Sequence, residues 1–232
     1  MTDRVAGQFP YRGTAFYDDH AVRDYVVDPA GLSALELACG DGRYAREPLP
    51  AGARACSGID GSARTVAAAR AAVGADNRAA VRHADLEDRE PDPDGAEVDV
   101  GVARMVLHYV NDLERVVRQV RVCLAIGGTF TFSVEHPVIT SDYAQVDGAP
   151  GAATQQVSGH FDERPRNCRW FGAEVAKHHR TVERYLSVLS AAGCTPFGFS
   201  EGRPRQDDFD SQERYRAMRD VPFHLIARGT AR

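Results

Sequence analysis

The feature that most constrains the fold of this chain is the regular alternation of short apolar segments with helical segments. Segments with the length and the apolar or β-branched composition of buried strands occur at 35–38, 54–60, 81–85, 98–102 and 129–134. Between the last two, apolar residues recur with the spacing of one helix face: Leu113, Val116, Val117, Val120, Cys123 and Leu124. Strands that alternate with helices at this spacing form βαβ units, so the sequence predicts a parallel sheet in an α/β domain.

Residues that start and stop helices fit this pattern. Ser62 is a favourable N-cap for a helix over 63–73, and the Gly127-Gly128 pair is expected to end the helix that starts near residue 113. A further helix is expected over 43–47, just before a proline. With 232 residues, the chain fits one large domain.

The pattern breaks over residues 137–172, which contain glycines, prolines and aromatic residues without clear periodicity. A segment of this kind in a compact domain is typical of a lid or a binding segment, and we expect a lid insertion after the fifth strand. Its aromatic side chains are expected either to line a pocket for an aromatic substrate or to anchor the loop by ordinary packing: Tyr143, Phe161, Trp170 and Phe171.

Beyond this insertion, a helix is expected over 182–189 and two strands over 195–200 and 221–228, with a solvated charged insert at 201–220. His224, in the second of these strands, is expected to be a packing residue. Residues 1–30 are expected to form an N-terminal helical cap, in which Tyr17 either helps to close over the site or packs in the core.

Composition narrows the partners and the location. A net charge of −5 and a pI near 5.9 argue against nucleic-acid binding, and no apolar run approaches the ~20 residues of a membrane span. The five cysteines contain no C-x-x-C pair, which disfavours a metal site and a disulfide framework and favours a cytoplasmic protein. Lys177 is the only lysine. We expect no nucleic-acid or membrane partner, and a monomer or a homodimer.

The strongest motif is the segment 36–43, Glu-Leu-Ala-Cys-Gly-Asp-Gly-Arg, between the first strand and the first helix. Its glycines, Gly40 and Gly42, allow a ligand to approach the backbone at the carboxyl edge of the sheet. Asp60 follows Gly40 by 20 residues and ends the second strand segment, where an acid accepts hydrogen bonds from ribose hydroxyls. Asp85 ends the third strand segment, in place to meet an adenine amino group. These acceptors predict a nucleoside pocket.

The spacing disfavours a dinucleotide. The G-x-G-x-x-G fingerprint requires a small residue at position 43, and this chain has Arg43 there. A nicotinamide oxidoreductase is therefore a weaker hypothesis than a protein that binds a single nucleoside.

With these motifs, the chain resembles the class I S-adenosylmethionine-dependent methyltransferases. The segments 36–42, 58–60, 83–86 and 98–110 look like their first four motifs, with Ala38 where the family usually has glycine. The phrases Phe-Ser-Val-Glu-His-Pro at 132–137 and Lys-His-His-Arg-Thr at 177–181 are similar to a small-molecule, natural-product branch. The resemblance implies a Rossmann-like, seven-stranded, mostly parallel sheet with helices on both faces and an antiparallel last strand.

The resemblance also implies S-adenosyl-L-methionine as cofactor. Gly40 and Gly42 would accommodate its methionine part, Asp60 its ribose, and Asp85 with Leu86 its adenine. The backbone of Ala103 and Arg104 would contact the sulfonium side. The full set of implied cofactor residues is Tyr17, Glu36, Ala38, Gly40, Gly42, Asp60, Gly61, Asp85, Leu86, Ala103 and Arg104.

Four residues are candidates for catalysis. Glu135 and His136 follow the fifth strand segment and are expected to accept a proton or to orient the substrate; the alternative is that they only shape a turn. His108 either supports the cofactor or acts on the substrate. His179 acts as a base or as a structural partner of Glu135.

The main hypothesis is methyl transfer to a nitrogen, or an oxygen, of a small aromatic metabolite in secondary metabolism. An alternative is O- or C-methylation by positioning without a base. Another is a non-catalytic subunit that binds the cofactor. No metal is required for methyl transfer in any of these hypotheses.

Overall fold

The computed structural model describes residues 22, 28–42, 48–88, 97–146, 154–170, 173–209, 211–219 and 221–232. Its centre is a seven-stranded sheet with the strand order β10-β11-β5-β4-β1-β2-β3. The strands are β1 Ser33–Leu37, β2 Ala55–Asp60, β3 Ala79–His83, β4 Val98–Arg104, β5 Leu124–Glu135, β10 Cys194–Ser200 and β11 His224–Ala231. Strands β1 to β5 are parallel to their neighbours among themselves, whereas β11 is antiparallel to both β5 and β10. The predicted Rossmann-like fold, with its antiparallel last strand, is confirmed.

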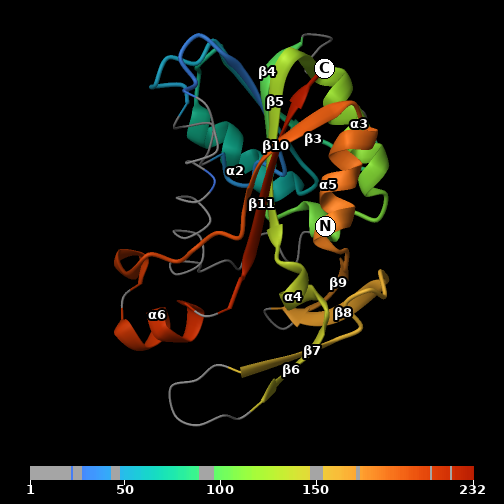
Figure 1. Ribbon diagram of the computed structural model, residues 1–232. Helices are drawn as coiled ribbons and strands as arrows, with labels where there is room; N and C mark the ends of the chain where they lie inside the picture. Colours follow the sequence, from blue (N-terminus) through green and yellow to red (C-terminus); the bar gives the residue numbers. More distant parts are fainter. Residues whose placement is uncertain are drawn as a thin grey trace.

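Helices cover both faces of this sheet. Helix α2, Ala63–Val73, lies on one side, and α3, Leu113–Cys123, lies with α5, Val182–Ala191, on the other (Figure 1). The Ser62 hydroxyl accepts from the Thr65 N–H and so caps α2 as predicted. The largest core cluster lies where α3 and α5 meet the sheet, and it includes the rings of Phe130, Phe132 and Tyr185. No helix in the described ranges has the length and apolar character needed to cross a membrane.

Several element ends differ from the predicted ones. Helix α3 ends at Cys123 and the chain enters β5 at once, so Gly127-Gly128 lies inside a long strand rather than at a helix end. The last strand begins at His224, three residues later than predicted, because the apolar run that starts at Val221 is longer than the part that pairs with β5. The predicted helix at 43–47 falls outside the described residues.

The insertion after β5 is not the structureless loop that its sequence indicated. It contains a short helix and two antiparallel hairpins: α4 Pro137–Thr140, β6 Asp142–Val146 with β7 Thr154–Ser158, and β8 Pro165–Trp170 with β9 Ala173–His178. The hairpins form small two-stranded sheets beyond the end of β5 (Figure 1). Strand β7, Thr-Gln-Gln-Val-Ser, has no apolar alternation in its sequence, so the periodicity signal fails there.

The remaining expectations concern peripheral segments. The charged insert contains two short helices, η2 Gln206–Asp208 and α6 Gln212–Arg219. Of the four insertion aromatics, Phe161 is 88% exposed, and its place in a substrate pocket stays a prediction. The side chains of Tyr143, Trp170 and Phe171 fall outside the described residues. So does nearly all of the predicted cap over 1–30, Tyr17 included.

Candidate active site

The glycine-rich turn after β1 is joined to the end of β2 by backbone hydrogen bonds. The Cys39 N–H donates to the Ile59 carbonyl at 2.9 Å, and the Gly40 N–H donates to Asp60 Oδ2 at 3.0 Å. The other oxygen, Oδ1, accepts from the Ser62 N–H at 2.9 Å. These bonds fix the carboxylate at the sheet edge, while each oxygen keeps a second lone pair for a ligand hydroxyl. Burial raises the pKa of Asp60 above its usual value, and the two backbone donors oppose that rise.

Close packing explains why this turn needs small residues. Gly42 has a φ of +76°, and a Cβ there would lie 3.1 Å from Ala69 in α2. A Cβ on Gly58 would lie 2.8 Å from the Cys39 sulfur. Ala38, where the resembling family has glycine, takes a φ of +53°, a left-handed conformation that strains a residue with a side chain. The turn geometry is therefore kept in spite of the substitution.

Glu36 and Arg104 lie at the carboxyl ends of neighbouring strands and form an ion pair. The Arg104 Nη2–Glu36 Oε1 distance is 3.1 Å, and the Glu36 side chain is only 6% exposed. Ala103 is fully buried beside them. The next residue, Met105, has a φ of +49°, and its N–H donates to the carbonyl of Ser133 in β5. The structure thus brings residues of the segments 36–42 and 98–110 into contact.

The predicted adenine residues lie at the exposed end of the same edge. Asp85 comes two residues after the end of β3, and its Oδ1 accepts from the Glu87 N–H at 2.9 Å. Leu86 is half-buried and packs against the large core cluster. Gly61 follows β2 directly, and a Cβ there would have its nearest contact at 4.0 Å. Along this edge of the sheet, Asp60 and Gly61 at the end of β2 lie between the glycine turn after β1 and the pair Asp85 and Leu86 after β3.

Glu135, at the end of β5, forms a buried ion pair with Lys177 of β9. The Lys177 ammonium lies 2.6 Å from Glu135 Oε1 and 2.7 Å from Oε2, and each residue is 7% exposed. The ammonium also lies over the ring of Tyr109, 6.0 Å from its centroid. A proton arriving on Glu135 would have to displace a hydrogen bond from Lys177, so this arrangement favours an orienting role over proton abstraction.

His108 lies next to this pair and has no exposed surface. Its Nδ1 accepts from the Glu135 N–H at 3.3 Å, so the neutral ring carries its proton on Nε2. That Nε2 is buried and meets no acceptor among the described residues. Burial, followed by the charge of Lys177, lowers the pKa of His108 well below the usual histidine value.

His136 caps the short helix α4, because its Nδ1 accepts from the Val138 N–H at 3.1 Å. Its Nε2 lies 3.3 Å from Glu201 Oε1. Burial lowers the pKa of His136, and the nearby Glu201 opposes this. Only 4% of His136 is exposed, so its ring packs inside the protein directly after the end of β5.

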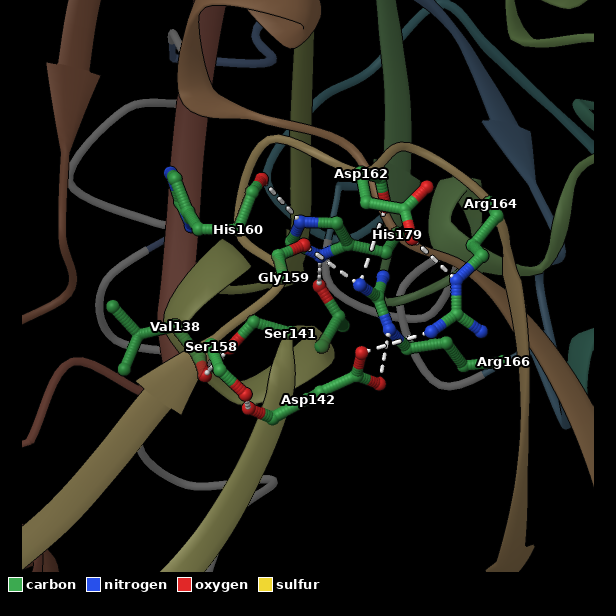
Figure 2. A network of polar contacts seen from close by, with 11 residues as sticks. Val138, Ser141, Asp142, Ser158, Gly159, His160, Asp162, Arg164, Arg166 and His179 are labelled. Carbon is green, nitrogen blue, oxygen red and sulfur yellow. Dashed lines mark hydrogen bonds and ion pairs between the residues drawn. The ribbon is translucent and has the colours of Figure 1, made fainter.

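His179 is not a partner of Glu135 but belongs to the base of the insertion. Its Nδ1 lies 2.8 Å from the Thr140 hydroxyl and its Nε2 lies 2.8 Å from the His160 carbonyl (Figure 2). In the same network, Asp142 pairs with Arg164 at 2.9 Å and with Arg166 at 2.7 Å. These bonds hold the start of β6 against the segment that leads into β8.

The sequence reasoning missed Arg180 as a residue of this region. Its guanidinium is buried and donates to four backbone carbonyls: Leu107, Val110, Asn111 and His178. Three of them belong to the turn after β4, which includes the 3-10 helix η1, Leu107–Tyr109. Arg180 therefore holds in place the turn that carries His108. Its place directly after Lys177-His-His was the available signal.

The described side chains contain no cluster of three or more histidines, cysteines or acids arranged to hold a metal ion. Cys39, although it lies in the glycine turn, is a poor nucleophile, since burial and the charge of Glu36 raise the pKa of its thiol to about 12.

Residues 35–130 match a family model described as a methyltransferase domain. The structure is similar to that of an S-adenosylmethionine-dependent methyltransferase from Mesorhizobium loti, with 30% sequence identity, a TM-score of 0.85, and coverage of 92% of this chain and 97% of that one. A Listeria monocytogenes protein proposed to be the same kind of enzyme has 27% identity and a TM-score of 0.83, over 95% of this chain and 99% of its own. An uncharacterized Haemophilus influenzae protein is 26% identical over 167 residues, which are 68% of this chain. The matched region spans 65% of the Haemophilus influenzae protein, less than two thirds of its length.

Proposed function

The chain belongs to the S-adenosylmethionine-dependent methyltransferases, and on that basis we propose that it transfers a methyl group to a nitrogen or an oxygen of a small aromatic metabolite, in secondary metabolism. The observation that carries this proposal is the shared sheet edge. The glycine turn with Asp60 and the polar cluster around Glu135 lie at the carboxyl ends of strands in one parallel sheet.

The residues at this edge fit the cofactor. A carboxylate held by two backbone N–H groups suits a ribose diol, and the turn backbone at Gly40, where an added Cβ would have no described atom within 4 Å, is open to a close approach. When bound, S-adenosylmethionine supplies an electrophilic methyl group on a sulfonium. We place the methionine part at Gly40, Gly42 and Glu36, and the ribose at Asp60 and Gly61.

The rest of the proposed cofactor set follows from its place along the same edge. Ala38, Ala103 and Arg104 would line the methionine and sulfonium side, and Asp85 with Leu86 the adenine. Tyr17 stays a prediction from the sequence.

The histidines favour a mechanism of positioning. In His108 and His136 a backbone N–H donates to Nδ1, and in His179 the Nε2 meets the His160 carbonyl, which can only accept. The neutral rings therefore keep their proton on Nε2, where they donate and do not abstract. Glu135, His136, His108 and His179 are proposed to shape and orient the acceptor site rather than to ionise the substrate. Holding the acceptor in line with the methyl group can itself lower the barrier by several kcal/mol.

Cofactor binding is tested by calorimetry. S-adenosylhomocysteine should bind the protein and NAD should not, and Asp60→Ala should weaken the S-adenosylhomocysteine affinity about 10-fold or more, because it removes a charged acceptor. Binding of NAD in preference to S-adenosylhomocysteine would contradict the proposal.

Turnover is tested with methyl-labelled S-adenosylmethionine and a panel of aromatic amines, phenols and carboxylates. Label should appear in at least one product, and Glu135→Gln should lower turnover while the affinity for S-adenosylhomocysteine stays unchanged. Cofactor binding without transfer to any class would favour the non-catalytic subunit.

A further inference from the structure

We propose that the buried cluster of His108, Glu135, Lys177 and Arg180 recognises an oxyanion of the substrate, a carboxylate or a phenolate, at the carboxyl ends of β4 and β5. This inference rests on the proposed function, because it names the chemical class of the substrate for the same site. The cluster comes from three separate segments: the turn after β4, the end of β5, and the end of β9 with the residues that follow it.

His108 presents a hydrogen-bond donor without an acceptor. The Glu135 N–H fixes the His108 ring with Nδ1 as acceptor, so Nε2–H is a donor. It is fully buried and meets no acceptor in the part of the chain that the structure describes. An unsatisfied buried donor is unfavourable, and proteins pair almost all such groups. An oxygen of the substrate would satisfy it, whereas an ammonium group could not.

The local balance of charge in this cluster is positive. The buried charged side chains described at the turn after β4 and at the ends of β5 and β9 are Glu135, Lys177 and Arg180, one carboxylate against two cations. Both oxygens of Glu135 are within 2.7 Å of Lys177, whereas Arg180 donates to backbone carbonyls, which carry no net charge. Buried charge is stabilised by a counter-charge, and the charge that would balance this described cluster is a negative one.

The positive field acts at the His108 ring itself. After burial, the charges of Lys177 and Arg180 are among the causes that lower the pKa of His108. The ring therefore stays neutral, with its N–H directed by the Glu135 backbone, in a region of positive potential. A positive region with a neutral N–H donor favours an anionic oxygen and disfavours a cationic amine.

The test uses three probes of one shape and different charge on the protein loaded with S-adenosylhomocysteine. Benzoate carries the anion, benzamide is its neutral counterpart, and benzylamine is the cation. Calorimetry should give a benzoate affinity about 10-fold or more above that of benzamide, as expected for a charge-assisted hydrogen bond, with benzylamine weaker still. A phenolate, 4-nitrophenolate, should behave as benzoate does.

Two sets of variants locate the effect. Arg180→Met removes the cation that is in excess, and it should reduce the ratio of benzoate to benzamide affinity to about one. Glu135→Gln/Lys177→Met removes one charge of each sign, so the cluster stays positive and the preference for benzoate should be kept. His108→Gln can offer an amide N–H near the place of Nε2, whereas His108→Leu cannot. Benzoate should therefore bind His108→Gln more tightly than His108→Leu.

The affinity for S-adenosylhomocysteine, measured in every sample, separates failure of the proposed function from failure of the oxyanion inference. If wild type does not bind it, the proposed function fails. If wild type binds it but prefers benzylamine, shows a benzoate-to-benzamide ratio of one or less, or responds to no probe, only the oxyanion inference is overturned. The oxyanion inference is also overturned if Arg180→Met keeps the preference for benzoate, or if Glu135→Gln/Lys177→Met loses it.

Discussion

Replacing Lys177 by methionine should destabilise the protein strongly, although it removes a charged side chain and adds an apolar one. The substitution leaves Glu135 buried without the ammonium that touches both of its oxygens, at 2.6 and 2.7 Å. Both side chains are 9% exposed, so water cannot take the place of the lost partner without opening the site. The expected loss is therefore that of an unpaired buried carboxylate.

The magnitude follows from the burial of this pair. Removing one partner of a buried ion pair costs about 3–5 kcal/mol of unfolding free energy. For a chain of 232 residues, each kcal/mol lowers the melting temperature by about 2–4 °C, so the expected decrease is roughly 6–20 °C. Glu135→Gln/Lys177→Met leaves no charge unpaired, and it should recover most of that loss because replacing the whole pair is often nearly neutral.

Urea unfolding followed by circular dichroism, with the melting temperature as a second readout, measures both variants against wild type. The Asp76–Arg78 pair is a matched control, since its atoms are also 2.7 Å apart but its side chains are 28% and 41% exposed, against 9% for each side chain of the buried pair. Asp76→Asn should leave the melting temperature essentially unchanged. A Lys177→Met variant as stable as Asp76→Asn, or a double variant no more stable than Lys177→Met, would refute the reasoning.

Three further predictions concern the same region. Burial lowers the pKa of His224 from 6.5 to about 4, so the unfolded chain binds the proton first as the pH falls. The contribution of the neutral His224 to the unfolding free energy is fully present above pH 6.5 and should decrease by about 3 kcal/mol toward pH 4. Urea unfolding at several pH values measures this, and a smaller decrease in wild type than in His224→Gln would contradict it. Gly58→Ala should cost about 1–3 kcal/mol and weaken S-adenosylhomocysteine binding, because its Cβ would lie 2.8 Å from the Cys39 sulfur, whereas Gly61→Ala has room and should fold normally; equal melting temperatures for the two would count against the packing argument. Arg180→Lys cannot reach the four carbonyls that the guanidinium reaches, so it should lower turnover and leave S-adenosylhomocysteine affinity within about twofold; unchanged turnover would remove Arg180 from the set of positioning residues.

The meeting of the glycine turn with Asp60 could be predicted because it depends on short-range features. The glycines at 40 and 42 and the acid at 60 are set by two strand ends that lie next to each other in the sheet, and the Gly40–Asp60 hydrogen bond follows from that arrangement. The strands and helices that position them are periodic, since one face of each packs on the core. The sequence therefore contained both the elements and the motif.

The polar cluster around Glu135 depends on contacts that the spacing of residues in the sequence does not reveal. Lys177 and Glu135 are 42 residues apart, and the chain between them forms hairpins without apolar alternation. For the same reason the sequence suggested Glu135 as a partner of His179, whereas the structure pairs His179 with Thr140 and His160. Side-chain partners in an insertion are decided by tertiary packing, and the pattern of a single sequence does not encode them.

The insertion is thus more than a cover for the site, because its last strand and the residues directly after it supply both cations of the polar cluster. Without β9 in place, Glu135 would lack its counter-charge and the turn after β4 would lose three hydrogen bonds to Arg180. The network at the base of the insertion runs from Thr140 through His179 to the His160 carbonyl, and His179 directly follows the last residue of β9. Any change that displaces the insertion therefore alters the charge at the end of β5 at the same time. In the proposed oxyanion site, substrate recognition and the folding of the insertion are therefore coupled through Lys177 and Arg180, the two residues that flank the histidine pair.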